Sequence, residues 1–310
     1  MIFDVLKIDT VKGSDSMKKV DIIGVQMDMG AGTRGVNMGP AAIRYAGLTD
    51  GIKALGMECL DKGDLIPMAS GKTADNMRCY EQVNDINKKL YHEVMSSLEN
   101  GAFPIVLRRD HSIAAGSISA TSKHYKNIGI IWVDAHGDWN NEESSPSGNM
   151  HGMPFSAVCG AGPDIMVDFG QDPVYVNTKN CVQIAGRDID EMERIRMREH
   201  GITVFSIADI DRMGMPKVID KAIEIASAGT EGIHVSFDVD SITPESAPGT
   251  GTVVHGLTLR EAFYLIETLC QSGKVIALDM VEVNPMLDIR NKTGELAMEL
   301  TLSMLGKVVY

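Results

Sequence analysis

The sequence has no apolar stretch long enough to cross a membrane, although 44% of its 310 residues are hydrophobic. A bilayer-spanning helix needs about 20 consecutive apolar residues, and polar residues interrupt every hydrophobic run well before that length. Basic runs are also absent: the net charge is −13, and no run of lysine and arginine exceeds two residues. Because an acidic surface repels phosphate groups, we expect neither a nucleic acid nor a membrane as the main partner.

Cysteine is sparse, and its five positions form no pattern typical of a disulfide framework or a thiolate metal site. The cysteines are scattered and include no C-x-x-C pair, so we interpret them as free thiols of a cytoplasmic protein. The first residues do not resemble a secretory signal, because Asp4, Lys7 and Asp9 interrupt the hydrophobic segment that such a signal requires. We predict an N-terminal extension of doubtful structure over residues 1–18 and a single domain over residues 19–310.

The rest of the sequence alternates short apolar runs with longer amphipathic segments. The runs are rich in valine and isoleucine and nearly continuous, which is typical of strands in a parallel sheet covered on both faces. Seven strands are predicted, over residues 20–26, 103–107, 128–133, 181–184, 204–207, 233–237 and 275–280. In residues 82–100, apolar side chains recur every three or four positions and form one face of a helix. This alternation predicts an α/β fold with a parallel or mostly parallel sheet.

Local signals mark the ends of two further helices. Pro216 is expected in the first turn of one helix, where its missing N–H costs nothing. Thr258 and Glu261 have the spacing of a capping box at the start of another helix, which Gly273 is expected to end. No linker-like stretch or internal repeat interrupts the chain, in agreement with a single domain.

Polar clusters follow four of the predicted strands. Open α/β sheets bind ligands at the carboxyl ends of their strands, so these clusters mark the expected site. The clusters are R-R-D-H-S at 108–112, D-A-H-G-D at 134–138, D-V-D at 238–240 and V-E-V-N-P at 281–285. A single D-x-D pair is more often a cap or a surface charge, and a lone histidine after a strand is more often a polar residue whose hydrogen bonds are satisfied. Their combination after successive buried strands instead favours a metal site.

The spacing within the clusters is that of metal ligands. Side chains two residues apart in an extended chain point to the same side, so the members of each D-x-H or D-x-D pair face together. Asp138 continues this series if the chain stays extended. Clustered carboxylates repel one another unless cations compensate them, and two divalent ions would do so. The candidate ligands are His111, Asp134, His136, Asp138, Asp238 and Asp240.

This ligand set favours Mn²⁺, because it offers oxygen and nitrogen atoms but no thiolate. Other divalent metals are less favoured. Two such ions about 3.5–4 Å apart can share a bridging hydroxide, which is a nucleophile at neutral pH. The sequence therefore predicts a metallohydrolase.

In this order, the motifs D-H-S, D-A-H-x-D, S-F-D-V-D and E-V-N-P resemble those of the ureohydrolases, the family of arginases and agmatinases. The resemblance extends from about residue 20 to residue 306. It implies a three-layer αβα sandwich with an eight-stranded, mostly parallel sheet and a binuclear manganese centre that hydrolyses guanidino groups. The family's metal ligands fall on the six residues that the spacing selects, so two Mn²⁺ per subunit are the expected cofactors.

The loop after D-A-H-x-D resembles the arginase version, in which D-x-N is followed by S-G-N-x-H-G. The resemblance implies that Asn140, Ser147 and Asn149 bind the α-carboxylate of L-arginine. Without the metal motif, S-G-N would be read as an ordinary turn. Asp190 would bind the α-ammonium group, although it is also placed to cap a helix that begins near residue 191.

The resemblance also assigns three catalytic roles. Glu282 would hold the guanidinium group as a carboxylate partner. Asp138 would orient the nucleophile and relay its proton. His151 would carry a proton to the leaving amine, because histidine titrates closer to pH 7 than other side chains.

Three residues depart from the family pattern. The family has two glycines before D-H-S, where this chain has Arg108 and Arg109, and it has an aspartate where this chain has Thr243. Glycine often marks a close approach of the backbone, so we expect the arginines to shift His111 or to crowd the metals. Their charges would also oppose metal binding, and Thr243 would remove a carboxylate from beside the ligands.

The sequence thus predicts an arginase that converts L-arginine and water to L-ornithine and urea. Two alternatives stay open. The first is another ureohydrolase, such as an agmatinase or a guanidino-acid hydrolase, although the α-carboxylate residues argue against agmatine. The second is a weakly active homologue acting as a metal-dependent binding or regulatory subunit, which the three departures keep open. Arg260 and Glu261 resemble the family's interface pair, so we expect a homo-oligomer, either a trimer or a hexamer.

Overall fold

The computed structural model describes residues 18–27, 38–74, 76–108, 110–251 and 253–308. Its centre is a sheet of eight strands: β1 (Lys19–Val25), β2 (Glu58–Leu65), β3 (Phe103–Leu107), β4 (Gly129–Val133), β5 (Cys181–Gly186), β6 (Thr203–Ser206), β7 (Ile233–Asp238) and β8 (Val275–Val281). The strands are all parallel, in the order β2-β1-β3-β8-β7-β4-β5-β6. The expected eight-stranded α/β fold is confirmed. Residues 1–17 of the predicted extension lie outside the described residues.

The apolar runs predicted seven of these strands and missed β2. This strand lies at the edge of the sheet and pairs with β1 alone among the described strands. Four of its eight residues are charged, so it has no apolar run that could reveal it. Arg44 of α1 (Gly39–Tyr45) holds the strand through ion pairs with Asp64 and, at 2.7 Å, with Asp61. Ion pairs therefore stabilise the edge where burial is incomplete.

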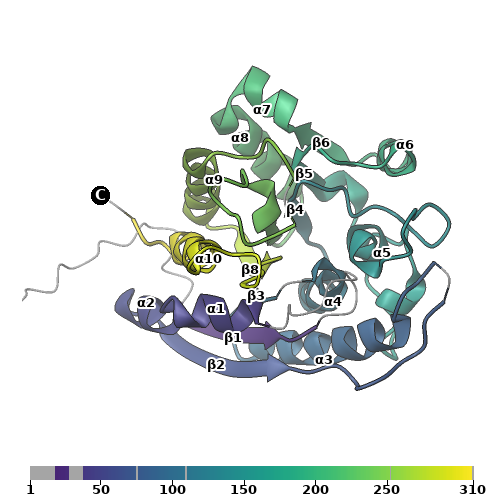
Figure 1. The fold of residues 1–310 in the computed structure, drawn as a ribbon, viewed down its shortest axis with the longest axis horizontal. Coiled ribbons are helices and arrows are strands. Elements are labelled where there is room, and N and C mark those ends of the chain that lie inside the picture. The colour runs from purple at the N-terminus through teal and green to yellow at the C-terminus, as the bar shows by residue number, and fades with distance from the viewer. Residues whose placement is uncertain (1–17, 28–37, 75, 109, 252, 309–310) are drawn as a thin grey trace, which may run out of the picture.

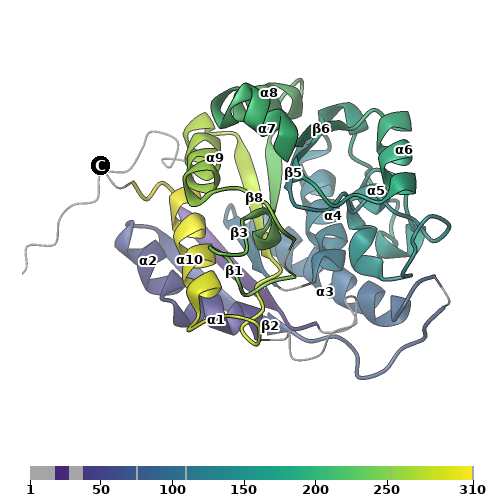
Figure 2. The same cartoon turned by 45° about the horizontal axis from the view of Figure 1, so that its top comes forward.

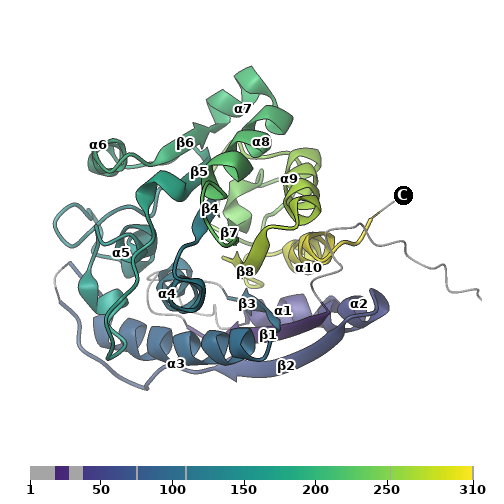
Figure 3. The same ribbon diagram turned by 180° about the vertical axis from the view of Figure 1, so that it is seen from behind.

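Helices cover both faces of the sheet and complete three layers (Figures 1 and 3). One face carries α1, α2 (Leu48–Ala54), α7 (Ile207–Met213), α8 (Met215–Ala226), α9 (Leu259–Ser272) and α10 (Lys292–Met304). The other face carries α3 (Tyr80–Glu99), α4 (Ala114–Tyr125), α5 (Pro154–Val158) and α6 (Glu191–Glu199). Figure 2 shows α8, α9 and α10 as neighbours along the first face. None of the described helices is both long and apolar enough to cross a membrane.

The helix signals in the sequence are confirmed at α8 and α9. Pro216 lies in the first turn of α8. At the start of α9, the Thr258 N–H donates to the Glu261 carboxylate at 2.8 Å, and the Glu261 N–H donates to the Thr258 hydroxyl at 3.3 Å. Gly273 ends this helix with a φ of 63°, in the left-handed region that glycine adopts without strain.

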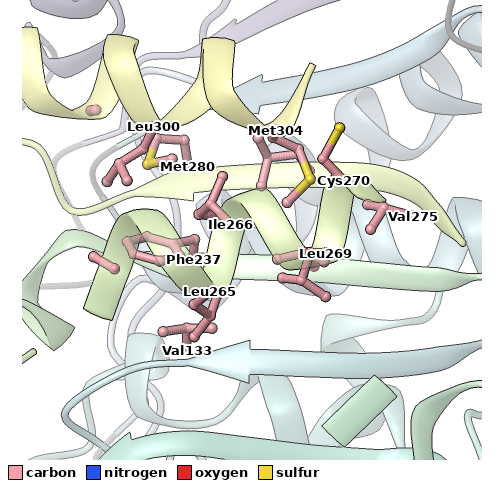
Figure 4. Close-up of a cluster of buried hydrophobic side chains, with 14 of the residues drawn as sticks. Val133, Phe237, Leu265, Ile266, Leu269, Cys270, Val275, Met280, Leu300 and Met304 are labelled. Carbon is pink, nitrogen blue, oxygen red and sulfur yellow. The ribbon is translucent and has the colours of Figure 1, made fainter. Parts of the chain in front are cut away.

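The core between the sheet and α9 and α10 is apolar and closely packed. Figure 4 shows Leu265 and Ile266 of α9 and Leu300 of α10 pointing toward Phe237 and Met280 of the sheet. All five side chains are fully buried. Burying a leucine, isoleucine, phenylalanine or methionine side chain contributes about 1.5–3 kcal/mol relative to leaving it exposed. This packing fixes β7 and β8, whose ends carry two of the polar clusters.

β4 begins at Gly129, where the sheet passes close to the end of α8. A Cβ atom at this position would lie 1.9 Å from the carbonyl oxygen of Ala226. We expect Gly129→Ala to lower the free energy of unfolding by about 2–3 kcal/mol, because a backbone must move to relieve the overlap. Urea unfolding followed by circular dichroism measures this change.

Gly251→Ala is the matched control, because no described atom lies within 4 Å of the Cβ that it adds. A Gly129→Ala protein as stable as this control would show that β4 and α8 can separate at little cost.

Candidate metal centre and substrate cavity

A cavity of about 470 Å³ opens at the carboxyl ends of the central strands. The twelve residues predicted for the site all line it: His111, Asp134, His136, Asp138, Asn140, Ser147, Asn149, His151, Asp190, Asp238, Asp240 and Glu282. Asp238 is the last residue of β7, and the others follow β3, β4, β5, β7 and β8, because parallel strands bring all of these ends to one edge of the sheet.

The first candidate ligand group surrounds His111, which follows β3. Its Nδ1 atom lies 2.9 Å from an oxygen of Asp134, 3.0 Å from one of Asp138 and 3.2 Å from one of Asp238. All four side chains are buried, and this nitrogen has no hydrogen bond of normal geometry. One nitrogen facing three carboxylate oxygens is a donor set that fits a metal cation.

The second group surrounds His136 and shares a residue with the first. His136 Nδ1 lies 3.0 Å from an Asp240 oxygen and 3.3 Å from Oδ1 of Asp134. Asp134 turns its other oxygen, Oδ2, toward His111. One carboxylate thus belongs to both groups, and this arrangement fits two cations held side by side.

His111 is oriented by neighbours that the sequence analysis did not select. Its Nε2 atom lies 2.8 Å from the Ser236 hydroxyl of β7. The Trp132 ring stacks on the imidazole with centroids 4.0 Å apart, and Trp132 Nε1 donates to Asp134 at 3.1 Å. Partners of this kind fix which ring nitrogen faces a metal. Ser236 could have been found, because it precedes Asp238 by two residues and therefore shares its side of the strand.

Two other side chains hold the ligand-bearing loops through backbone carbonyls. Gln183 of β5 donates to the carbonyls of Asp134 and His136, at 2.9 and 3.0 Å. The Arg187 guanidinium donates to the Asp240 carbonyl at 2.6 Å and to the Val253 carbonyl at 3.0 Å. These contacts join segments that are far apart in the sequence, so no local motif predicts them.

The backbone at Asp138 differs from the predicted extended form. Its φ is +48°, so the chain turns there and the period-two series ends at His136. The Asp138 carboxylate still reaches His111 at 3.0 Å. Glu282 also has a positive φ, +64°, and its carboxylate accepts the His111 N–H at 3.0 Å. Positive φ is uncommon outside glycine and concentrates at functional sites, where the surrounding structure imposes it.

The cluster contains more negative than positive groups. Burial raises the pKa of Asp238 well above its usual value, and the neighbouring Asp240 and Asp134 raise it further. Burial alone would lower the pKa of His111 and of His136, but the surrounding carboxylates outweigh it and raise both. Bound divalent cations would neutralise this excess charge.

The residues expected to bind substrate line the same cavity, and two of them, Ser147 and Asp190, are exposed. Asn140 donates to Asp190 at 3.2 Å and accepts from the Ser144 hydroxyl at 2.9 Å. The Ser147 hydroxyl accepts the Asn149 N–H at 3.2 Å. Asp190 is the N-cap residue of α6 and also lines the cavity, so both of its predicted positions are found together.

Glu193 lines the same cavity, although the sequence analysis did not select it. It accepts the N–H groups of Trp139 and Asp190, at 2.6 and 3.2 Å. Burial raises the pKa of Glu193 to about 8, and the nearby Asp138 adds to the shift. The D-x-x-E spacing from Asp190 to Glu193 is that of a capping box and could have revealed this residue.

Arg108 does not displace His111 as expected. The side chain is fully buried, and its guanidinium lies 3.6 Å from the Asp279 carboxylate of β8. Asp279 also accepts from Ser117 and lies 3.2 Å from His234 Nε2. The arginine is thus paired beneath the site, while His111 keeps its carboxylate neighbours.

The other two departures from the family pattern give less information. Arg109 lies outside the described residues. The Thr243 hydroxyl donates to Glu245, and its N–H donates to the Leu257 carbonyl at 3.0 Å.

Comparison with known proteins agrees with this geometry. The sequence profile of the Arginase family matches residues 18–306. The chain belongs to the arginase family. It is 43% identical over 299 residues to the arginase of Staphylococcus aureus strain MSSA476, covering 94% of this chain and 98% of that one. The Bacillus subtilis strain 168 arginase is also 43% identical, over 292 residues, with the same coverage.

The solved structures of arginase-family members show the same architecture. The Bacillus cereus arginase superposes with a TM-score of 0.89 at 42% identity, covering 94% of this chain and all of that chain. The Bacillus caldovelox arginase gives a TM-score of 0.90 at 40% identity, covering 95% and 100%. The expected ureohydrolase membership, and with it a hydrolase of this family, is confirmed.

The Arg108–Asp279 pair gives a prediction about stability. Asp279→Asn removes the carboxylate that is ion-paired with the buried guanidinium, so we expect the free energy of unfolding to fall by about 3–5 kcal/mol. Arg108→Met added to Asp279→Asn removes the unpaired cation and should recover much of this loss. Urea unfolding of the two single variants and the double variant forms the double-mutant cycle. Additive losses would show that the two residues do not interact.

Proposed function

We propose that the protein is a manganese-dependent arginase that hydrolyses L-arginine to L-ornithine and urea. One observation carries the proposal: the S-G-N segment at 147–149 lines the same cavity as the two candidate ligand groups. A substrate that reaches from the ligands to this segment would place its reactive group at the ligands. Its other end would be a carboxylate, which the donors of the S-G-N segment can bind. L-Arginine has this form, and the curated relatives in the comparison are arginases.

In this proposal, His111 with Asp134, Asp138 and Asp238 would hold one Mn²⁺, and His136 with Asp134 and Asp240 would hold the other. These residues fit, because their donor atoms already converge. The four carboxylates also carry more negative charge than the two imidazoles could neutralise if both were protonated. When bound, two divalent ions supply Lewis acidity and lower the pKa of water so that hydroxide forms at neutral pH.

The chain's own residues then orient the substrate. Glu282 binds the guanidinium, a planar cation that matches a carboxylate in charge and geometry. Asn140, Ser147 and Asn149 offer neutral hydrogen-bond donors to the α-carboxylate, so they bind an anion without placing a positive charge beside the ligands. Asp190 receives the α-ammonium group, and Glu193 lies beside it.

Proton transfer is assigned to two residues. Asp138 orients the attacking water and accepts its proton. His151, which lies in the short turn at 150–152 and lines the cavity, protonates the amine of ornithine as it departs. A histidine suits this role because its unperturbed pKa lies near neutrality.

A urea-release assay tests the proposed reaction and separates it from the alternatives. We would supply L-arginine or agmatine to the purified protein, with and without added Mn²⁺. Mn²⁺-dependent release of urea from L-arginine, with little from agmatine, supports the proposal. Preference for agmatine would indicate an agmatinase, and no release from either would favour a binding or regulatory role.

The metal ligands give a prediction about metal content. Asp238→Ala removes a buried carboxylate from the first ligand group and leaves the remaining donors incomplete. We expect metal analysis to show fewer than two Mn²⁺ per subunit and activity to fall by at least about 10²-fold. Two retained ions with full activity would contradict the assigned ligands.

The substrate loop gives a prediction about specificity. Asn149→Asp places a carboxylate against the α-carboxylate of arginine, and this repulsion should lower kcat/KM for L-arginine by about 10²-fold. Agmatine lacks that carboxylate and should be hydrolysed as well as before or better. Steady-state kinetics with both substrates measures the difference. Equal losses would mean that this loop does not contact the amino-acid end.

We further propose that the chain forms a homo-oligomer, a trimer or a hexamer, through the Arg260–Glu261 pair at the start of α9. Glu261 already caps this helix through Thr258, which fixes the position of its carboxylate.

A further inference from the structure

Arg78, which lies just before α3, is hydrogen-bonded to the S-G-N segment at 147–149. The Arg78 N–H donates to the Gly148 carbonyl at 2.9 Å. Its guanidinium Nη1 also donates to the side-chain Oδ1 of Asn149, at 3.3 Å. Two hydrogen bonds from one residue therefore join the segment before α3 to the S-G-N segment, 71 residues away.

The guanidinium determines which way the Asn149 amide points. An asparagine amide has a donor nitrogen and an acceptor oxygen, and exchanging them changes its shape very little. A guanidinium has only donors, so the oxygen must face Arg78 and the NH₂ group is the part of the amide left for another partner. A carboxylate only accepts hydrogen bonds, so it binds the NH₂ group and is repelled by the oxygen.

Asn140 shows the same arrangement, although its partner is different. Its amide oxygen accepts from the Ser144 hydroxyl at 2.9 Å, and its NH₂ group donates one proton to Asp190 at 3.2 Å. In both side chains the amide oxygen thus already accepts a hydrogen bond. Both residues line the cavity, whereas Arg78 and Ser144 do not line it.

We propose that Arg78 is a positioning residue that selects substrates with an α-carboxylate. It acts through Asn149, by holding the amide with its donor available to the substrate. Its exposed positive charge also lies beside Asn149, which is the proposed contact of the α-carboxylate. This inference rests on the proposed function, because it assigns a role in the specificity of the same site.

The test compares Arg78→Met with a matched control in the same segment. Arg78→Met keeps an unbranched apolar stem and removes both the charge and the donors. Lys72→Met removes an equal charge from a residue that pairs with Glu81 at 3.0 Å and does not line the cavity. Arg78→Lys retains a cation that can only donate, so it should restore most of the lost binding.

We expect Arg78→Met to raise KM for L-arginine about tenfold and to change kcat by less than about twofold, because the α-carboxylate contact is made equally before and during the reaction. The ratio of kcat/KM for L-arginine to that for agmatine should fall about tenfold, and Lys72→Met should leave it within about twofold. An unchanged ratio in Arg78→Met would overturn the inference while leaving the proposed function intact.

A double-mutant cycle tests whether Arg78 acts through the amide. In an Asn149→Ala background, Arg78→Met should change KM by less than about twofold, because the group that it positions is gone. The full tenfold effect in that background would overturn the positioning role.

A binding measurement makes the test independent of turnover. Calorimetry on the Mn²⁺-loaded protein should show about tenfold weaker binding of L-ornithine to Arg78→Met than to the wild type, with a smaller change for putrescine, which has no carboxylate. If the wild type released no urea, the proposed function would fail, and L-ornithine binding would still decide the role of Arg78. Equal binding of L-ornithine by both proteins would contradict that role.

Discussion

The structure depends on the repulsion among buried carboxylates at one edge of the sheet. Asp134, Asp138, Asp238 and Asp240 lie within a few ångströms of two imidazoles, and all four are buried. Two divalent cations bound among these carboxylates would relieve the repulsion. The rest of the fold holds this unfavourable arrangement in place, and its excess negative charge would favour the binding of metal cations. A compact ligand set of this kind therefore needs a rigid sheet beneath it.

That rigidity comes from polar contacts beneath and around the ligands as well as from the apolar core. Ser236 and Trp132 orient His111, and Gln183 and Arg187 hold the carbonyls of loops that carry the ligands. The Arg108–Asp279 ion pair is another buried polar contact next to the ligands. The Arg108 guanidinium lies 3.6 Å from a carboxylate of the neighbouring strand, and His111 keeps its own carboxylate neighbours.

In the proposed function, specificity depends on a second set of contacts, made by side chains other than the ligands. Ser144 and Arg78 each occupy the oxygen of an amide that lines the cavity, which leaves donors for a substrate carboxylate. Such contacts add no affinity for the guanidinium end. They change the difference in binding free energy between substrates with and without a carboxylate. The expected effects are therefore on KM and substrate preference and not on kcat.

The sequence by itself determined the type of fold, seven of the eight strands and the six candidate metal ligands, and its resemblance to the ureohydrolases added the six other site residues. Buried strands carry continuous apolar runs, and the ligand motifs follow those runs directly. It did not reveal β2, whose edge position leaves half of its residues charged, or the turn at Asp138. Only the tertiary structure decided the partners of Arg108, the orientation of the Asn149 amide and the roles of Gln183 and Arg187. These features depend on contacts between segments far apart in the chain. A local pattern of residue types cannot predict which distant side chain makes each contact.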